Sequence, residues 1–458
     1  RCHGRSSYNY QRTTSSKYPV VQWTGNYETS FYAHHFKPST VGSYGNRDSI
    51  FAPRFSLYRS SGKEPQQSGE EQIWLGLNFV SKFDGAGLSP TNRPPLRVAI
   101  VLDVSGSMSQ NLGESKDSKL AVAKENLLSV TNQLQENDEI TFLTFNTEPT
   151  VVQPLVRWGN IDKTEFTSAV NGLKSGGGTE LSKALLGAAD VLKSADESEE
   201  DKQIRVLLLT DMEANREDDE ATFVENVKKL SNDGLYTTII GVGMDMARKT
   251  VQDTSKTPGC NYCNVRAVEQ FRHLMESEFS FLVTPIAFDV HMNVNEESGW
   301  TVSQGFGSPE ISDVPLDSIQ FSSIFPSSMN EEKTGLRSGC YAFKISRTTT
   351  PGGPTASNEL PPIPVEISWA DTNGLRTTIQ EELQFEAPVF FDDSIENCED
   401  SIKNTDGLRK CVLLIHFTDY AQEVVKGYNS AIKTNGILPS GSKLNEFIEY
   451  LELQSKDI

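Results

Sequence analysis

The stretch that decides the fold reads Val98-Ala99-Ile100-Val101-Leu102-Asp103-Val104-Ser105-Gly106-Ser107. Its first five residues form a continuous apolar run, which is typical of a parallel strand covered on both faces. Asp103, Ser105 and Ser107 follow where that strand ends, and ligands of open α/β sheets bind outside the carboxyl ends of the strands. The segment therefore predicts a buried strand that leads into a polar binding loop.

The chain after this strand alternates between helical and strand patterns. Apolar runs predict further strands at 140–145, 204–209 and 236–242. Apolar residues spaced three and four apart predict helices near 120–134, 181–192, 221–230 and 268–282. This alternation predicts an α/β domain with a doubly wound, mostly parallel sheet over residues 96–285.

Sequence of β character flanks the α/β domain on both sides. Alternating apolar residues predict a strand at 72–80, and later strands are expected at 286–294, 339–345 and 364–369. Because a lone strand cannot bury its face, the early strand is expected to join the later ones in a β-sandwich. The expected division is an extended polar arm at 1–50, sandwich strands at 51–95, the α/β domain at 96–285, the sandwich at 286–392 and a C-terminal helical segment at 393–458.

The arm at residues 1–50 is polar and carries no helical stripe. Tyr27, Phe31 and Phe36 stand at strand-like positions in it. We expect the arm to be ordered by pairing with a sheet edge of its own chain or of a neighbouring subunit. Simple disorder is the alternative.

Charge and hydropathy limit the classes of partner. The chain has 62 acidic and 42 basic residues, which gives a formal net charge of −20. Such a charge repels phosphate backbones and anionic lipids, so nucleic acid is not an expected partner. No apolar run reaches the ~18 to 20 residues that cross a bilayer, so no membrane span is expected. The start at Arg1 instead of Met indicates a removed leader or a fragment.

Six cysteines form an even set, which suits three disulfides in an oxidising compartment. Cys260 and Cys263 have CxxC spacing between two expected loops, and a short loop disulfide is favoured over a redox pair or half a zinc site. Cys398 is expected to pair with Cys411 across the turn at 404–407. Cys2 and Cys340 then remain for each other by elimination.

Two more segments carry oxygen donors at element boundaries. Ser175-Gly176-Gly177-Gly178-Thr179-Glu180 is a glycine loop that leads into a helix, and in Leu207-Leu208-Leu209-Thr210-Asp211 a second apolar strand ends in Asp. With the first loop, these segments supply hard oxygen ligands, which suit one Mg²⁺ or Ca²⁺ ion. The candidate metal ligands are Asp103, Ser105, Ser107, Thr179 and Asp211. In the alternative interpretation these side chains only cap helices or form Asx turns.

The three segments, in this order, resemble the metal-ion-dependent adhesion site of von Willebrand factor type A domains. The resemblance covers about residues 96–285 and implies that the five candidates hold the metal, with Asp103 and Asp211 acting mostly through water. Met212 stands where the family usually has Gly, which makes the loop bulkier. Residues 259–265 and 279–292 also resemble secreted bacterial-type proteins in which this domain continues into a β-sandwich.

No catalytic motif is present: HExxH, GxSxG, Walker and GxGxxG patterns are all missing from the sequence, and no nucleophile–base pair is visible. Five ligands leave an open position on the metal, which would accept a carboxylate from a protein partner. We therefore expect an extracellular or cell-surface, non-enzymatic adhesion or matrix protein. One alternative is a filament or coat subunit that forms a homo-oligomer through its arm, with a merely stabilising metal. A second alternative is an enzyme or an enzyme's regulatory subunit, such as a metal-chelatase or protease-inhibitor component. The acidic runs at 196–201 and 217–220 are interpreted as solvated surface.

Overall fold

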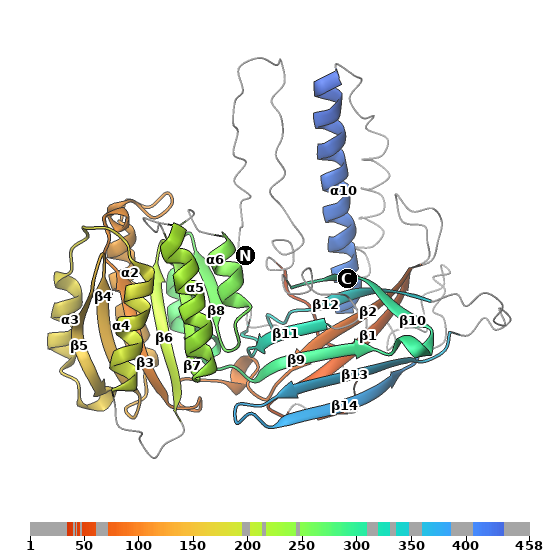
Figure 1. Cartoon of the computed structure of the whole chain (residues 1–458), viewed down its shortest axis with the longest axis horizontal. Coiled ribbons are helices and arrows are strands. Elements are labelled where there is room, and N and C mark those ends of the chain that lie inside the picture. The colour runs from red at the N-terminus through yellow and green to blue at the C-terminus, as the bar shows by residue number, and fades with distance from the viewer. Residues whose placement is uncertain are drawn as a thin grey trace.

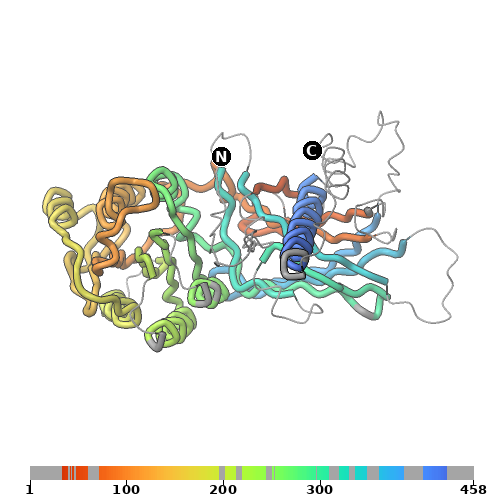
Figure 2. Tube along the Cα trace, turned by 90° about the horizontal axis from the view of Figure 1, so that it is seen from above, coloured from red at the N-terminus to blue at the C-terminus, as the bar shows by residue number. Residues whose placement is uncertain are grey.

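The computed structural model describes residues 34–39, 42, 44–45, 48–60, 72–194, 202–212, 217–243, 248–308, 319–329, 336–347, 360–385 and 406–434. Two bodies lie side by side along the long axis, an α/β domain and a pair of antiparallel sheets, with a long helix rising from the sheets (Figure 1). The view from above separates the same two bodies (Figure 2). Within the described ranges, no helix is long and apolar enough to cross a membrane.

The α/β domain is built on a six-stranded sheet with the order β5-β4-β3-β6-β7-β8. All neighbouring strands are parallel except β5, which runs antiparallel to β4 at the edge. The strands are β3 (Leu96–Asp103), β4 (Glu139–Phe145), β5 (Pro149–Arg157), β6 (Gln203–Thr210), β7 (Leu235–Val242) and β8 (Asn261–Val265). The helices are α2 (Lys119–Val130), α3 (Lys163–Gly172), α4 (Leu181–Lys193), α5 (Glu217–Asn232), α6 (Arg248–Ser255), α7 (Val268–His273) and α8 (Phe279–Val283).

Helices cover both faces of this sheet, which explains the continuous apolar run in β3. All eight residues of β3 are buried. Val98, Ile100 and Leu102 pack into a core with α2, α3, α7 and α8. Ala99 and Val101 face the opposite side and pack against α4 and α5. The doubly wound, mostly parallel sheet predicted from the sequence is confirmed.

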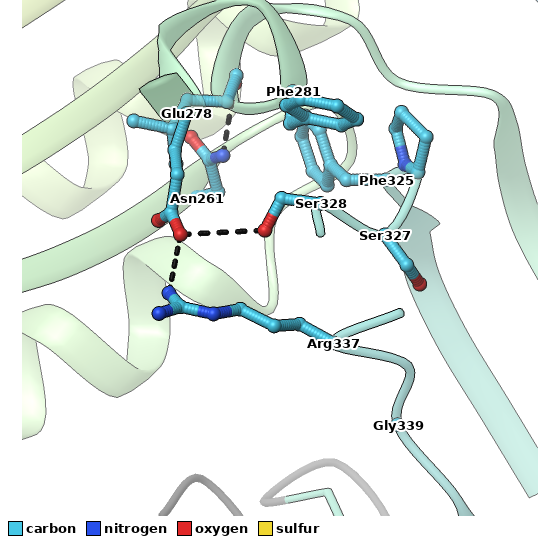
Figure 3. Close-up of a pocket in the computed structure, with 10 residues that line it drawn as sticks. Asn261, Glu278, Phe281, Phe325, Ser327, Ser328, Arg337 and Gly339 are labelled. Carbon is cyan, nitrogen blue, oxygen red and sulfur yellow. Dashed lines mark hydrogen bonds and ion pairs between the residues drawn. The ribbon is translucent and has the colours of Figure 1, made fainter. Parts of the chain in front are cut away.

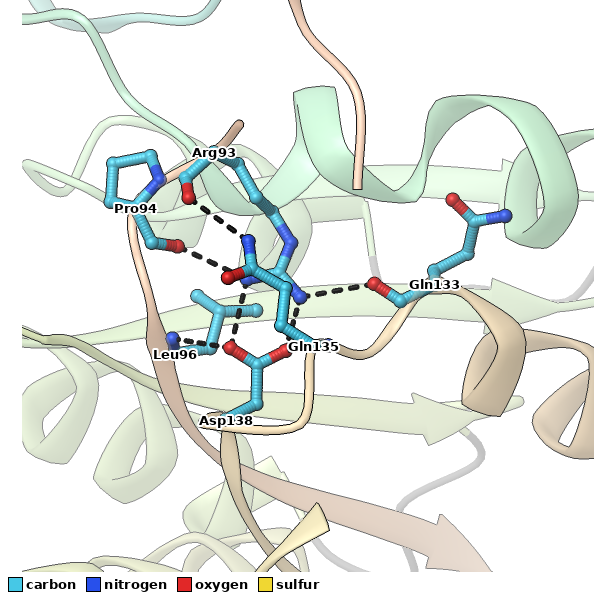
Figure 4. Close-up of polar contacts among 6 residues, drawn as sticks. All are labelled: Arg93, Pro94, Leu96, Gln133, Gln135 and Asp138. Carbon is cyan, nitrogen blue, oxygen red and sulfur yellow. Dashed lines mark hydrogen bonds and ion pairs between the residues drawn. The ribbon is translucent and has the colours of Figure 1, made fainter. Parts of the chain in front are cut away.

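A buried ion pair fixes the point at which the chain enters β3 (Figure 4). The guanidinium of Arg93 binds the Asp138 carboxylate, and neither side chain is exposed. Asp138 Oδ1 also accepts the backbone N–H of Leu96 at 2.9 Å, and its Oδ2 accepts that of Gln135 at 2.7 Å. Because Asp138 directly precedes β4, this network aligns the starts of β3 and β4.

The second body consists of two four-stranded antiparallel sheets, with the orders β1-β2-β12-β10 and β11-β9-β13-β14. Their inner faces share one core that includes Leu75, Trp300, Phe321 and Ile367. As expected from the sequence, the strand at 72–80 joins the later strands, because β2 pairs with β12. The strands are β1 (Ala52–Ser60), β2 (Gln72–Val80), β9 (Ala287–Val294), β10 (Trp300–Phe306), β11 (Ile319–Ile324), β12 (Tyr341–Arg347), β13 (Ile363–Ala370) and β14 (Arg376–Leu383).

Helix α10 (Asp406–Thr434) packs its first turns on the outer face of the β1-β2-β12-β10 sheet. A small core there contains Trp74, Leu408 and Phe36, one of the three aromatic residues singled out in the arm. The backbone N–H of Phe36 donates to the carbonyl of Ser338 at 3.0 Å. This end of the arm is therefore held by its own chain, whereas Tyr27 and Phe31 lie outside the described residues.

The structure corrects the expectation for the CxxC pair. Cys263 lies in strand β8 and not in a loop, and both thiols are free. Cys260 packs into the core on the α4–α5 face, whereas Cys263 packs against the core on the α2 face. The two side chains therefore lie on opposite faces of the sheet, and they do not form the predicted loop disulfide. Cys2 and Cys398, the partners expected for Cys340 and Cys411, lie outside the described residues.

Candidate metal-binding site at the carboxyl ends of the parallel strands

Two adjacent parallel strands deliver the candidate carboxylates. Strand β3 ends at Asp103, and its neighbour β6 ends at Thr210, directly before Asp211. The chain turns to opposite sides of β3 to form β4 and β6, so this edge is a topological switch point, where open α/β sheets bind ligands. Both aspartates are buried, with exposed fractions of 0% for Asp103 and 1% for Asp211.

The carboxylate of Asp103 organises the first loop. Its Oδ1 accepts the backbone N–H of Ser105 at 2.8 Å, and its Oδ2 accepts the Thr210 hydroxyl at 2.6 Å. The hydroxyls of Ser105 and Ser107 lie 3.0 Å apart, so both face the same side of the turn. Burial raises the pKa of Asp103 to about 6, and the hydrogen bonds from Ser105 and Thr210 oppose this rise. The arrangement places one carboxylate and two hydroxyls around a single point.

The glycine loop is held against the first loop by backbone hydrogen bonds. Gly106 donates its N–H to the carbonyl of Gly177 at 3.1 Å, and Gly176 donates to Val104 at 2.7 Å. Gly177 has a φ of +89°, and a Cβ there would lie 2.8 Å from the side-chain nitrogen of Asn146. A residue with a side chain would therefore be strained as well as crowded at this position. The two loops form one rim of the site, and Thr179, at the end of the glycine loop, is buried.

Asp219 positions the segment that carries Thr179. Its carboxylate accepts the backbone N–H of Leu181 at 2.6 Å and that of Ser182 at 3.1 Å, at the first turn of α4. These two bonds satisfy N–H groups that a helix start leaves unpaired. The interpretation of the acidic run 217–220 as solvated surface was therefore wrong for Asp219, which is 9% exposed. Sequence reasoning missed it because a cap between separate helices leaves no local pattern.

Lys119 is the second residue that sequence reasoning missed. It is the first residue of α2, its side chain is buried, and its Nζ lies 2.9 Å from Asp211 Oδ2. The two residues are 92 positions apart, so no local motif pairs them. A buried ammonium group thus neutralises one of the candidate metal ligands.

Met212 adopts a left-handed backbone conformation, with a φ of +57°. Its N–H donates to the Thr210 hydroxyl at 3.0 Å, and its side chain is 2% exposed in the core on the α4–α5 face. This conformation favours Gly, which accounts for the residue that the family usually has at this position. The bulkier side chain points into the domain and not toward the serine loop.

The donor set suits a hard divalent cation. Carboxylate and hydroxyl oxygens are the ligands that Mg²⁺ and Ca²⁺ prefer, and the serine pair shares the side on which Asp103 lies. Among the described residues, no group of three or more His, Cys, Asp or Glu could hold a metal. Here only two of the five candidate ligands are carboxylates, and the other three are hydroxyls.

A cavity of about 280 Å³ lies at the junction of the two bodies, away from the loops (Figure 3). Glu278 accepts hydrogen bonds there from Arg337 and, at 3.3 Å, from the Ser328 hydroxyl. His273 Nε2 lies 3.1 Å from the same carboxylate oxygen. Because Arg337 and Ser328 contact Glu278 across the junction, these polar contacts hold the two bodies together.

The von Willebrand factor type A domain family matches residues 98–277, a range that contains all three loops described above. Residues 98–277 form a von Willebrand factor type A domain. The remaining β-sheets and helix α10 lie outside this match.

Two relatives of this VWA-containing chain are inhibitor heavy chains. Inter-alpha-trypsin inhibitor heavy chain H4 of Bos taurus is 26% identical over 258 residues, which are 54% of this chain and 26% of that protein. Heavy chain H3 of Homo sapiens is 30% identical over 172 residues, which are 37% of this chain and 18% of that protein. The chain spans about a quarter or less of the length of these curated relatives.

A solved structure shares the fold beyond the VWA domain. The protein described as von Willebrand factor type A from Catenulispora acidiphila superposes with a TM-score of 0.52. The match covers 91% of this chain and 90% of that chain, at 15% sequence identity. At that identity the likeness concerns the fold alone, and its coverage extends over the antiparallel sheets as well as the VWA domain.

Proposed function

We propose that this chain is an extracellular, non-enzymatic binding protein whose VWA domain holds one divalent cation and presents it to a carboxylate of a protein partner. The observation that carries the proposal is the convergence at one sheet edge of the Asp103 carboxylate with the Ser105 and Ser107 hydroxyls. Thr179 and Asp211 complete the ligand set. The two heavy-chain relatives support a role in binding proteins, because their name refers to a trypsin inhibitor.

The exposure of the loops supports this use of the site. Asp103 and Asp211 are buried, whereas Gly106 and Gly177 at the rim are exposed and Ser107 is half-buried. A cation held between them would have its protein ligands on the inner side and solvent on the outer side. A partner carboxylate could then replace a water on the solvent side, since five protein ligands do not fill an octahedron. Carboxylate and hydroxyl oxygens suit either Mg²⁺ or Ca²⁺.

Isothermal titration calorimetry with Mg²⁺ and with Ca²⁺ tests the site directly. The wild-type chain should bind one ion of at least one of the two metals, and Asp103→Ala should give no heat of binding while it keeps its fold. Asp190→Ala, which removes an exposed carboxylate of α4, is the matched control and should bind as the wild type does. Absence of binding in the wild-type chain, or undiminished binding in Asp103→Ala, would refute the metal site.

Light scattering with and without EDTA tests how the metal relates to assembly. A metal-bridged contact between copies of the chain predicts that chelation lowers the mass in solution. Assembly through the arm predicts a mass that EDTA does not change. If the chain is a monomer under both conditions, its partner is a different protein. We favour this form of the proposal, because the end of the arm at Phe36 is buried in its own chain.

A further inference from the structure

Lys119 places a positive charge inside the candidate metal site. Its Nζ lies 2.9 Å from Asp211 Oδ2, and the two side chains are 5% and 1% exposed. Gln110 Oε1 lies 3.4 Å from the same nitrogen. A Cβ at Gly243, which follows β7 with a φ of +120°, would lie 3.1 Å from the Lys119 Cε. The Lys119 side chain thus packs between the loop before α2 and the glycine after β7.

The charges of the site can be counted from these contacts. Asp103 and Asp211 supply two carboxylates when both are ionised, and Lys119 supplies one ammonium group. A divalent cation added to these three groups gives the four together a net charge of +1. Without the ammonium group, the loaded site would be neutral. Electrostatic interactions are strong in a buried environment, so the Lys119 charge strengthens the attraction of the loaded site for an anion.

We propose that Lys119 determines the specificity of the site: it weakens the hold on the metal and makes the metal-loaded site a receptor for anionic partner groups. The proposal rests on the proposed function, because it concerns the same cation. Lys119 acts as a positioning and charge-setting residue through Asp211 and does not itself coordinate the ion. In the alternative role, Lys119 only holds Asp211 in place. Removing Lys119 should then weaken metal binding, whereas the proposed role predicts that its removal strengthens metal binding.

The test compares Mg²⁺ affinity in three variants by titration calorimetry. Lys119→Met removes the charge but retains an unbranched stem, and it should bind Mg²⁺ about tenfold more tightly, or better, than the wild type. Lys119→Arg keeps the charge and should bind no more tightly than the wild type. Lys202→Met is the matched control, because Lys202 is a buried lysine paired at 3.0 Å with Glu139, which starts β4 at the opposite end of the sheet. Its metal affinity should equal that of the wild type.

A second measurement follows the anion. Acetate is added to Mn²⁺-loaded protein, and the paramagnetic broadening of its methyl proton signal reports acetate bound near the ion. The wild type and Lys119→Arg should broaden the signal more than Lys119→Met at equal metal occupancy. Equal broadening, or Mg²⁺ affinity in Lys119→Met no higher than in the wild type, overturns the role of Lys119 but leaves the metal site standing. Failure of the wild type and Lys119→Met alike to bind metal overturns both proposals.

A separate observation concerns Cys340 and Cys411. Cys340 directly precedes β12, and Cys411 lies in the second turn of α10. Their exposed fractions are 1% and 0%, and the Cys340 side chain, after burial, contributes to the raised pKa of Cys411. Cys411 Sγ also lies 3.9 Å from the Cys340 carbonyl oxygen. The two thiols therefore meet inside the small core that holds α10 against the sheet.

The geometry points to a disulfide between Cys340 and Cys411 that ties α10 to the β1-β2-β12-β10 sheet, in place of the pairs expected from the sequence. The two thiols lose two protons and two electrons, the sulfur–sulfur bond forms, and an external disulfide such as oxidised glutathione is reduced to two thiols. Burial raises the pKa of Cys411 well above its ordinary value, so few thiolates form in the folded chain. The bond would therefore form during folding, before α10 closes over the pair.

Peptide mapping tests this pairing in the full chain produced in an oxidising secretory compartment. Free thiols are blocked with N-ethylmaleimide under denaturing conditions, and the chain is digested without reduction. A peptide pair linked through Cys340 and Cys411 is expected, with Cys260 and Cys263 recovered as blocked thiols. Recovery of Cys340 or Cys411 as a blocked thiol, or linked to any other cysteine, overturns the assignment. Reduction should also lower the melting temperature of the wild type, but not that of the Cys340→Ser, Cys411→Ser double variant.

Discussion

The ring of Tyr236 in β7 stacks on the ring of Phe288 in β9, with centroids 5.5 Å apart and planes inclined by 29°. The first residue belongs to the VWA domain and the second to the antiparallel sheets, so this stack lies across the junction of the two bodies. Hydrogen bonds from the Ser322 hydroxyl to the Lys256 carbonyl and from the Gly259 N–H to the Ser323 hydroxyl cross the same boundary. The junction is thus packed and specific, and the sheets form a fixed support for the VWA domain.

A double-mutant cycle should detect this stack as a coupling between the two bodies. Tyr236→Ala and Phe288→Ala should each lower the free energy of unfolding, and the pair should show a coupling of about 1 kcal/mol, the range of aromatic pairs. Denaturant unfolding of the four chains gives the value. Leu375→Ala is the control, because Leu375 is 69% exposed and its loss should change stability by less than about 0.5 kcal/mol. Additive effects of the two ring deletions would show that the bodies are not coupled here.

Arg205 is a buried cation at the same junction, and its replacement by an apolar side chain should be tolerated. Its Nη1 donates to Thr238 Oγ1 at 2.8 Å and to the Gly259 carbonyl at 2.9 Å, and its guanidinium lies 5.9 Å from the Phe325 ring centre. Among the described residues, Nε and Nη2 have no hydrogen-bond partner. Burial lowers the pKa of Arg205 to about 10, because the charged guanidinium is poorly solvated in the interior.

Arg205→Met keeps most of the buried stem and removes this incompletely bonded charge. The free energy of unfolding should stay within about 1 kcal/mol of the wild type or rise, as found for other buried charges replaced by apolar residues. Arg205→Ala should lower it by roughly 3 kcal/mol, because it also leaves a cavity. Chemical denaturation compares the three chains. Equal, large losses in both variants would show that the charge itself stabilises the junction.

The left-handed backbone at Met212 should make a Gly variant more stable than an Ala variant, the reverse of the usual order of stability. Both Met212→Ala and Met212→Gly lose the buried side chain, which costs roughly 2 to 5 kcal/mol. At a φ of +57°, however, Gly is free of the strain that Ala retains, so the Gly variant should be about 1 kcal/mol more stable than the Ala variant. Thermal or denaturant unfolding measures the difference. An Ala variant at least as stable as the Gly variant would contradict the left-handed conformation.

The parts of the fold that the sequence predicted are those with a local signal. The apolar run Val98–Leu102 and the alternation of apolar residues at 72–80 directly indicate which strand residues are buried. Strands β3 and β2 lie at these positions. Strands β5 and β14 escaped prediction because they lie at sheet edges and are largely exposed, so little apolar patterning marks them. The pairing of strands and the core between the two sheets depend on contacts between segments that are distant in the sequence. The sequence indicated them only through the argument that a lone strand needs a partner.

The candidate site divides in the same way. Asp103, Ser105 and Ser107 are recognisable because they follow one strand within five residues. The structure confirms that Asp103 and Asp211 end adjacent strands, whereas metal binding by them stays a prediction. Lys119 and Asp219 were missed because each acts on a segment tens of residues away. Their charges face the interior only after the chain has folded, and an isolated Lys or Asp in a polar stretch looks like surface.

The stability of the metal-free protein should fall as the pH rises through the range in which Asp103 loses its proton. Burial, followed by the nearby Asp211, raises the pKa of Asp103 to about 6, above an ordinary value of 3.8. Between these two values the folded chain holds a proton that the unfolded chain has lost, so the stability from this group is fully present below about pH 4 and is lost as the pH rises through 6.

Asp103→Asn removes this titration and isolates its effect. The difference in unfolding free energy, wild type minus variant, should decrease by about 3 kcal/mol between pH 3.5 and pH 7 in the presence of EDTA, since each unit of pKa corresponds to about 1.4 kcal/mol. Asp190→Asn, which removes an exposed carboxylate of α4, controls for the change in net charge. Excess Mg²⁺ should stabilise the wild type more at pH 7 than at pH 5, because the proton and the cation compete for the same carboxylate. A wild-type minus Asp103→Asn difference that stays constant or increases with pH would show that Asp103 is ionised throughout, held by a charge that the described contacts do not include.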